Sequence, residues 1–396
     1  MLLPLRPRPQ PDELLTSWLV RLAWANARKL HPFCRDLFGG RSHHWYRDLD
    51  VSCSAGDLGR IATATGVPPA RVEEATFRTF EGVVFEQLHA RGPTPWVMRM
   101  RHVGRARLAH GQQMCWRCLR DDASPYFRRH WRLAFSVVCR RHDVLLSDAC
   151  LQCSAPISYH EGDYGLIEVP RECSITTCKH CGFDQRRGDH RHRSPIDPAV
   201  VDLQARIEEM VEQGYSLRLP GGTSYAALAF AGMQRILRVL AANGRVGRLR
   251  EHLLRQRGEL ALNIPGQTNG MQFWHLRLAD RYGLLHQLAE LLEDWPRVFV
   301  DSCRAARLSY SYIHPTSDPL PYWLHQPIRL ELWDRYYAPN DEERKAVRHY
   351  LERHRLGATE NDVRRWLGVS HNSSLVRASA RPAQQWNPRR FSSPKS

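Results

Sequence analysis

Apolar residues near the start of the chain recur with the spacing of a helix. The run Pro-Asp-Glu-Leu-Leu at residues 11–15 is typical of a helix start, and Asp12 is placed to cap it. The apolar positions that follow share one helical face: Leu14, Leu15, Trp18, Leu19 and Leu22. We therefore predict a packed amphipathic helix in this stretch.

A helix-turn-helix pattern follows at residues 56–76. A first helix contains Leu58 and Ile61, a turn falls at Gly66, and a second helix begins at Pro68-Pro69 and carries Arg71. Because any short helical hairpin can show this pattern, the unit serves either to contact DNA or only to pack its helices.

The second half of the chain keeps the helical period. Apolar spacing of this kind recurs at residues 200–213, 225–242, 247–257, 276–292 and 340–355. Pro195 and Pro198 introduce the first of these segments, which indicates a domain boundary near residue 195. We expect the segments to form a helical bundle.

A second helix-turn-helix candidate lies near the end of the chain. Thr359-Glu-Asn-Asp362 has the form of a capping box in front of an apolar run. A turn at Gly368 and a helix capped by Ser370 come next. These caps are better than those of the first candidate.

The charge of the chain points to a polyanionic partner. Lys and Arg number 57 against 41 Asp and Glu, which gives a net charge of +16 and a pI near 9.7. Codon bias explains why arginine exceeds lysine but not why basic residues exceed acidic ones. We expect contact with nucleic acid or a nucleoprotein. With no apolar run near the 18 or so residues of a membrane span and no secretory signal, we expect a cytoplasmic protein without membrane contact.

Eight of the eleven cysteines fall between residues 115 and 181, which favours metal ligation over disulfides in a cytosolic chain. Cys115-Trp-Arg-Cys118 and Cys139-Arg-Arg-His142 form two pairs with two-residue spacing. Together they supply three thiolates and one imidazole, the four ligands of a closed tetrahedral zinc site. Such a sphere has no position for water, so it predicts a structural role.

A second set of four ligands follows directly. It consists of Cys150-Leu-Gln-Cys153 and Cys178-Lys-His-Cys181, and Gly182 suits the tight backbone after the last pair. Cys173 competes as a ligand, but only the last pair repeats the spacing. We expect His160 and His180 to face solvent. The prediction is two structural Zn²⁺ ions per chain.

Aromatic residues and arginines alternate between the two halves of the first site, from Ser124 to Leu133. Arg128 and Arg129 could contact phosphate while the rings stack on bases. A zinc module also needs a small apolar core of its own, and we favour that role for Tyr126, Phe127 and Trp131.

These patterns predict a mainly α fold, with helix-turn-helix units around a double zinc-finger module and a helical C-terminal domain after it. The domains that we expect are an N-terminal helical region at 1–110, the zinc module at 111–190, a helical domain with a helix-turn-helix at 195–378, and a basic disordered tail at 379–396.

Three features together resemble the TniQ family of transposition proteins, over residues 4–185. The first is Arg-Pro-x-Pro-x-Pro-Asp-Glu-Leu-Leu-x-Ser-Trp-Leu-x-Arg-Leu from Arg6 to Leu22. The second is Cys115-x-x-Cys118 followed by Pro-Tyr-Phe-Arg-Arg-x-Trp-Arg-Leu, and the third is Cys139-x-x-His142 with Leu145-Leu146 and Cys150-x-x-Cys153.

This resemblance implies an adaptor between a target selector and an AAA+ transposition regulator that recruits the transposase. In relatives the target is either a fixed DNA site or an RNA-guided CRISPR effector complex with its guide RNA, to which some relatives dock as dimers. It implies a possible homodimer, and it implies metal ligation for Cys115, Cys118, Cys139, His142, Cys150 and Cys153.

An enzyme would need other motifs. GxxxxGK[ST], GxSxG and HExxH do not occur in the sequence. Asp121 and Asp122 with nearby histidines could serve a metal-dependent nuclease, but cap turns more simply. The alternative to an adaptor is a zinc-containing transcription regulator that binds DNA sequence-specifically through the helix-turn-helix units.

We assign candidate contact surfaces from the same patterns. The regulator contact is expected around Trp18 and Arg21, and the target contact on the helix with Arg364 and Arg365. Arg71, Arg128 and Arg129 are further candidates for nucleic-acid or partner contact.

Overall fold

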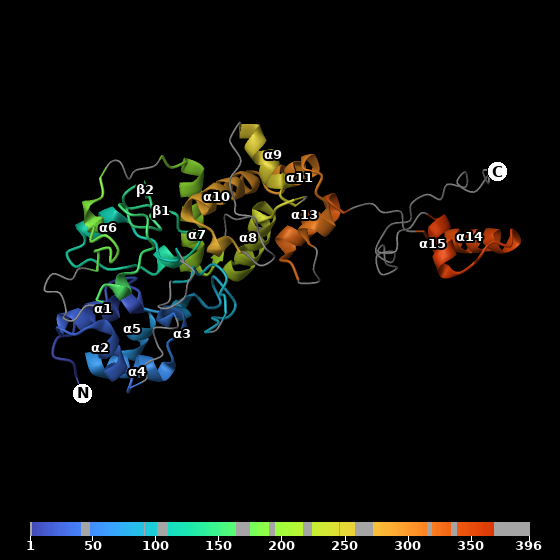
Figure 1. Ribbon diagram of the computed structural model, residues 1–396. Coiled ribbons are helices and arrows are strands. Elements are labelled where there is room, and N and C mark those ends of the chain that lie inside the picture. Colours follow the sequence, from blue (N-terminus) through green and yellow to red (C-terminus); the bar gives the residue numbers. More distant parts are fainter. Residues whose placement is uncertain are drawn as a thin grey trace. The chain divides into compact units, whose positions relative to one another are not determined.

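The computed structural model describes residues 2–40, 48–90, 92–100, 110–163, 175–189, 195–216, 224–244, 246–257, 272–314, 319–333 and 339–367. The fold is mainly helical, as predicted, with only short strands (Figure 1). The chain divides into two compact units, residues 1–332 and 333–396, which we describe separately. Among the described helices, none is both long and apolar enough to cross a membrane.

Five short helices build the N-terminal part of the first unit: α1 (Leu15–Ala25), α2 (Leu30–Leu37), α3 (Leu49–Ser52), α4 (Ala55–Thr65) and α5 (Pro69–Glu73). Helix α1 packs against α2 and α3, while α4 packs against α5 (Figure 1). The predicted apolar stripe of α1 is fully buried, which confirms the amphipathic helix.

The predicted cap of α1 is wrong. The helix begins at Leu15 with Leu14 at the N-cap, and no side chain caps it. Asp12 instead lies in the left-handed region at φ 56°. Its carboxylate accepts hydrogen bonds from Arg129 and His130, so tertiary partners 117 and 118 residues away compete successfully with the local cap.

Helices α4 and α5 form the first predicted hairpin. The Ser54 hydroxyl accepts a hydrogen bond from the Asp57 amide and caps α4. Gly66 ends the helix in the left-handed conformation at φ 67°, which glycine adopts without strain. Pro69 is the first residue of α5, which spans only five residues.

The cysteine region consists mostly of turns and short elements: α6 (Trp116–Asp121), η3 (His130–Arg132), β1 (Val138–Cys139), β2 (Val144–Leu145), η4 (Tyr159–Glu161) and η5 (Gln185–Arg187). Strands β1 and β2 pair antiparallel, with Val138 opposite Leu145 and Cys139 opposite Val144. Helix α6 packs against η5.

Helices dominate the rest of the first unit: α7 (Pro198–Gln213), α8 (Ala226–Ala241), α9 (Arg248–Arg257), α10 (Leu278–Glu293), α11 (Arg297–Ala305), α12 (Tyr310–Ile313) and α13 (Tyr322–Glu331). The hairpin of β3 (Tyr215–Ser216) and β4 (Ser224–Tyr225) precedes α8. Helix α10 lies between α7, α8 and α11 (Figure 1). Helices α7 to α10 were predicted, whereas α11 to α13 were not.

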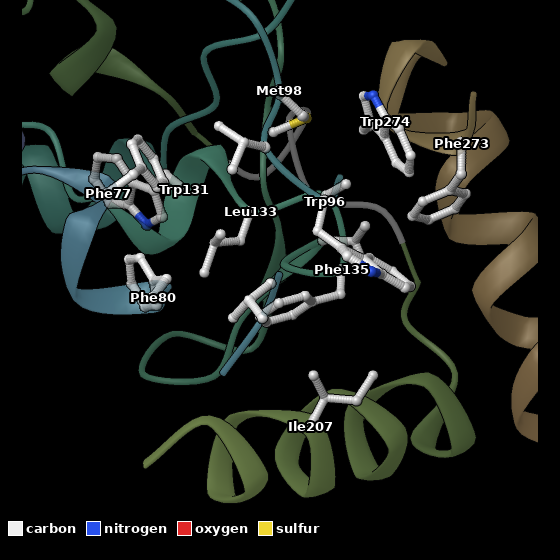
Figure 2. Close-up of a cluster of buried hydrophobic side chains, with 14 of the residues drawn as sticks. Phe77, Phe80, Trp96, Met98, Trp131, Leu133, Phe135, Ile207, Phe273 and Trp274 are labelled. Atoms are coloured by element: carbon white, nitrogen blue, oxygen red, sulfur yellow. The ribbon is translucent and has the colours of Figure 1, made fainter. Parts of the chain in front are cut away.

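One hydrophobic core extends through the first unit. Figure 2 shows Trp96, Phe135 and Phe273 converging in this core. The Trp96 ring lies 6.3 Å from that of Phe135 and 5.7 Å from that of Phe273, which comes from η7 (Phe273–His275). The break between compact units therefore lies after Leu332 and not near residue 195.

Polar contacts also tie the C-terminal helices to the cysteine region. The Gln204 amide of α7 accepts hydrogen bonds from the backbone of Val137 and Val138 and donates one to the Val138 carbonyl. Arg277, the residue just before α10, binds Asp148 at 2.8 Å. These contacts explain why the two regions share one core.

The second unit contains α14 (Asp341–Arg353) and α15 (Glu360–Trp366) around a small core of Val347, Leu351, Val363 and Leu367. The predicted capping box is confirmed, because the Thr359 amide binds the Asp362 carboxylate and the Asp362 amide binds the Thr359 hydroxyl. The predicted turn at Gly368, the helix after Ser370 and the tail at 379–396 lie outside the described residues.

Candidate metal centres

The first predicted ligand set comes together in the structure. One possible ligand atom from each of Cys115, Cys118, Cys139 and His142 lies within 4.8 Å of the others. Sulfur atoms of Cys118 and Cys139 are 3.6 Å apart, and the His142 Nδ1 lies 3.3 Å from the Cys118 sulfur. The cysteines are buried and the histidine is half-buried.

Local backbone places these four side chains. Cys115 is the N-cap of α6, where its sulfur accepts the Cys118 amide at 3.5 Å. Cys139 ends β1, and a tight turn toward β2 returns His142, whose amide binds the Cys139 carbonyl. Asp143 takes a left-handed conformation at φ 48° to complete this turn. Each pair thus converges because its two-residue spacing closes one turn.

A carboxylate orients the histidine. The His142 Nε2 lies 3.0 Å from an oxygen of Asp121, while its Nδ1 faces the three sulfurs. Such a carboxylate fixes the imidazole ring and raises its basicity toward a metal. The sequence suggested Asp121 only as a turn cap, and the contact with His142 reflects the fold of α6 onto the β1–β2 turn.

The second predicted set also converges, with ligand atoms of Cys150, Cys153, Cys178 and Cys181 within 4.8 Å of one another. The sulfurs of Cys150 and Cys181 are 3.7 Å apart, as are those of Cys153 and Cys178. Gly182 has φ 71°, so it supplies the tight turn expected after the last pair. Cys173, the competing ligand, lies outside the described residues.

A neutral side chain supports this second set. The Gln185 amide donates to the Cys150 sulfur at 3.1 Å, and its oxygen accepts the Leu151 amide. Although burial opposes it, hydrogen bonding from Gln185 and from the backbone of Gln152 and Cys153 lowers the pKa of Cys150 to about 7. The thiolate, which is the form that binds metal, is thereby favoured.

The spacing of the ligand atoms can be compared with what zinc requires. Ligands placed tetrahedrally at the usual zinc–sulfur distance have sulfurs about 3.8 Å apart, with a sulfur and an imidazole nitrogen about 3.6 Å apart. The 3.6 and 3.7 Å sulfur pairs and the 3.3 and 3.5 Å sulfur–nitrogen pairs lie close to these values. Both sets could therefore hold a metal ion.

The two histidines expected at the surface behave differently. His180 is exposed, as predicted. His160 is buried in η4, and the prediction for it is wrong. Burial lowers the pKa of His160 to about 4, against the opposing attraction of Glu161. The polar residues next to His160 in the sequence gave no indication that it is buried.

The aromatic run between the halves of the first site belongs to the core, as we favoured. Phe127 and Trp131 are buried, and Tyr126 is nearly so. The Phe127 ring stacks on Tyr159 at 4.1 Å, which joins the first half of the cysteine region to the segment after Cys153.

Arg128 and Arg129 lie inside this packing. Arg128 is buried, binds Asp122 at 2.8 Å and covers the Tyr126 ring. Arg129 reaches Asp12 and the Thr79 hydroxyl, so it joins the cysteine region to the N-terminal helices. Their described partners are protein groups. Both residues therefore serve packing and ion pairing within the chain, and we do not propose them as phosphate contacts.

The predicted contact residues of α1 are also internal. Trp18 is fully buried and donates its indole N–H to the Pro7 carbonyl. Arg21 binds buried Glu13 at 2.6 Å. Trp18 therefore cannot contact a partner directly, and Arg21 is held by its own chain. The apolar face that made Trp18 conspicuous in the sequence is the face that packs.

The other candidates lie nearer the surface. Arg71 on α5 has a side chain 44% exposed and pairs with Glu74. Arg364 on α15 approaches Glu360 at 3.8 Å. The side chain of Arg365 is outside the described residues.

A buried ionic network joins the N-terminal helices to the cysteine region, and sequence reasoning missed it. Arg132 is fully buried and binds both Asp48 and Asp50. Asp50 also accepts hydrogen bonds from Thr16 of α1. Burial raises the pKa of Asp50 to about 6, against the attraction of Arg132. The only sequence signal is the aromatic–arginine alternation, which does not reveal a partner 82 residues away.

Comparison with known proteins relates the N-terminal part of the chain to one family. Residues 4–146 match the TniQ family model, a stretch that includes α1 to α6 and all four ligands of the first set. The search of curated proteins gives no match.

Proposed function

We propose, from the premise that this chain belongs to the TniQ family, that it is a non-catalytic adaptor in transposition. The family implies a function associated with transposition. In the proposed role, the chain links a target selector, either a DNA site or an RNA-guided CRISPR effector complex, to an AAA+ regulator that recruits the transposase. The match over residues 4–146 is the observation that carries the proposal.

Both cysteine sets bind zinc in this proposal, and the zinc is structural. Three thiolates with an imidazole, or four thiolates, are the ligands of closed zinc sites. Four protein ligands fill a tetrahedron, so neither set offers a position where a substrate or water would react. No residue receives a catalytic role.

Burial and ion pairing guide where we place the partner contacts in this proposal. With Trp18 and Arg21 internal, Arg71 is the exposed candidate of the N-terminal region, and we place the regulator contact on the surface that carries it. We place the target contact on the second unit, at the helix that carries Arg364. Separable surfaces are what an adaptor requires, because it must hold two partners at once.

The test is recovery of partners with the tagged full-length chain, together with a DNA-shift assay and an insertion assay. We expect an AAA+ ATPase to co-purify and insertion at the chosen target to increase, without cleavage of DNA by the chain itself. Association with DNA or a nucleoprotein should weaken steeply as salt rises, through counterion release.

Two charge-reversal variants, one at the proposed regulator surface and one away from it, test where the regulator binds. Arg71→Glu should reduce the recovered ATPase several-fold, because it reverses a charge at the proposed surface. Arg255→Glu is the control: Arg255 is 75% exposed on α9 and also pairs within its own helix, with Glu251. Tight sequence-specific DNA binding without any recovered ATPase, transposase or CRISPR subunit would contradict the adaptor and favour the transcription regulator.

A further inference from the structure

A groove in the C-terminal part of the first unit carries an unusual share of exposed apolar side chains. It has a volume of about 830 Å³ and is lined by residues of α8 and α13, of the β3–β4 pair and of the turn between α10 and α11. Five of the nine exposed large hydrophobic residues in the described part line it: Tyr215, Tyr225, Leu228, Tyr322 and Leu330. A concentration of this kind marks an interaction site.

The floor of this aromatic groove is held in place by its neighbours. The Trp323 ring lies against Gly232 of α8, where a Cβ atom would approach the ring to 2.0 Å. Its indole N–H donates to the Leu228 carbonyl at 3.2 Å. Trp295 packs edge-on against Trp323, with ring centroids 5.0 Å apart. The two indoles therefore form a preorganised aromatic floor.

Tyrosines form the rim. Tyr225 is 76% exposed and Tyr322 is 74% exposed. Tyr215 lies opposite Tyr225 in the β3–β4 hairpin, so both side chains lie on one face of the ribbon. The hydroxyls of these tyrosines and the Trp295 indole N–H make no hydrogen bond to other described residues. They are free to donate to a ligand.

The lining determines which ligand fits. Among the described residues that line the groove, Glu331 alone is charged, and it pairs with Arg304 at 2.6 Å. Although the chain carries a net charge of +16, the described lining residues include no lysine or arginine that could bind a polyanion. This described lining therefore favours a neutral or positively charged ligand over nucleic acid or an acidic peptide.

A helix and an extended peptide make different demands on such a surface. An amphipathic helix satisfies its own carbonyls and needs aliphatic pockets, whereas the described lining has two leucines and two prolines beside five aromatic residues. A polyproline II segment leaves its carbonyls free and packs its proline rings on aromatic side chains. The unused donors and the tyrosine and tryptophan lining match the second.

We propose that the aromatic groove binds an extended, proline-rich peptide segment of neutral or positive charge on a partner protein. Proline rings pack between the tyrosines of the rim and the indoles of the floor, while the tyrosine hydroxyls and the Trp295 indole donate to peptide carbonyls. This binding site is independent of the adaptor role and of both metal sites.

The test uses the full-length, zinc-loaded chain and a fluorescently labelled synthetic peptide in which proline alternates with arginine and serine. We expect saturable binding by fluorescence anisotropy. Replacing both Tyr225 and Tyr322 with alanine should weaken binding about tenfold or more, since each substitution removes an aromatic contact with the peptide. Because both side chains are largely exposed, the double variant should keep the thermal stability of the parent chain.

Two comparisons make the result specific. Trp366→Ala removes an exposed aromatic ring from the second unit and should leave peptide binding unchanged. The same peptide with alanine in place of proline should bind at least about tenfold more weakly, because it is not preorganised. Equal binding of the alanine peptide, or undiminished binding by the double tyrosine variant, would overturn the proposal. So would self-association that the double variant abolishes while no peptide binds.

Discussion

The first metal site lies inside the main core, whereas the second lies at its edge. Three of the four ligands of the first set are buried, but Cys153 and Cys181 in the second are exposed. Asp121 supports the first set with a charge, while Gln185 supports the second with a neutral amide.

The difference indicates that the two candidate metal sites would hold different parts of the fold together. The first set ties α6 to the β1–β2 turn within a core shared with the N-terminal and C-terminal helices. The second brings the Cys150–Cys153 pair to the Cys178–Cys181 pair. The described residues near it contact the N-terminal helices and the aromatic run through Tyr159, which stacks on Phe127, and Asp163, which accepts hydrogen bonds from Trp24 and Leu30. Loss of the first should therefore spread through the unit, while loss of the second should stay local.

The largest effect should come from removing a ligand of the first site. Cys115→Ser or His142→Ala should cost on the order of 5 kcal/mol and reduce soluble yield, because structural zinc binding is coupled to folding. Zinc content and thermal unfolding measure it. Cys53→Ala, at a buried cysteine outside both sets, is the control and should keep two zinc ions per chain. Unchanged stability and zinc content in the ligand variants would contradict the assignment.

Removing a ligand of the second site should have a smaller effect. Cys153→Ser should lower zinc content from two ions to one while the N-terminal helices keep their amide protection. A chelator should likewise remove zinc from the parent chain in two phases, with the faster phase absent from the variant. A single phase, or global loss of protection in Cys153→Ser, would show that the two sites are equivalent.

Acid should lower the free energy of unfolding through the buried histidine of η4, His160. Its pKa is lowered to about 4 in the folded state, below the value of 6.5 for a free histidine. The unfolded chain therefore gains a proton first, so the stability from neutral His160 is complete above pH 6.5 and is lost as pH falls toward 4. At pH 5 the loss should be about 2 kcal/mol.

The control for this pH dependence is a neutral isostere. His160→Gln should flatten the fall in unfolding free energy between pH 6.5 and 4, measured by denaturant titration at fixed zinc. Replacing exposed His180 with glutamine should leave that slope as it is in the parent chain. A slope that persists in His160→Gln would locate the acid sensitivity elsewhere.

The smallest effect on zinc affinity should come from the side chains that hydrogen-bond to the ligands. Asp121→Asn should weaken zinc at the first site about tenfold, because the charged partner of His142 is lost. Asp143→Asn is the control at the exposed neighbouring residue, whose left-handed conformation asparagine tolerates. Gln185→Leu should weaken the second site less than Asp121→Asn weakens the first. A larger loss of zinc affinity in Gln185→Leu than in Asp121→Asn would contradict the proposal that the charged partner supports its site more strongly.

Short-range patterns in the sequence predicted features that short-range geometry controls. Two-residue spacing predicted the two clusters that could hold a metal ion, because a Cys-x-x-Cys or Cys-x-x-His turn brings its two side chains together within one turn. Apolar periodicity identified α1 and α7 to α10, and Thr359 with Asp362 identified the start of α15. Helices α11 to α13 were not predicted. Helix α12 has only four residues and α13 contains Pro327, so both give a weak helical pattern in the sequence.

The roles of individual polar side chains depended on distant partners. Asp12 is a residue type that often caps helices, but it binds Arg129 and His130 instead. Arg128 is a residue type that often contacts phosphate, but it lies buried against Asp122. His160 lies among polar neighbours in the sequence and is buried in the structure. In each case contacts from other segments outweigh the local preference, because burial makes a satisfied partner worth more than a local cap.

From its sequence alone, this protein was determined to be mainly helical, with two four-ligand metal sets and a TniQ-like N-terminal half. Those properties follow from spacing within a turn or a helix, which neighbouring residues control. Only the tertiary structure decided that the first set lies in the core and the second at the edge, that 1–332 forms one unit, and that an aromatic groove crosses α8 and α13. Burial and long-range pairing depend on segments that meet only after folding, and no local pattern records which segments will meet.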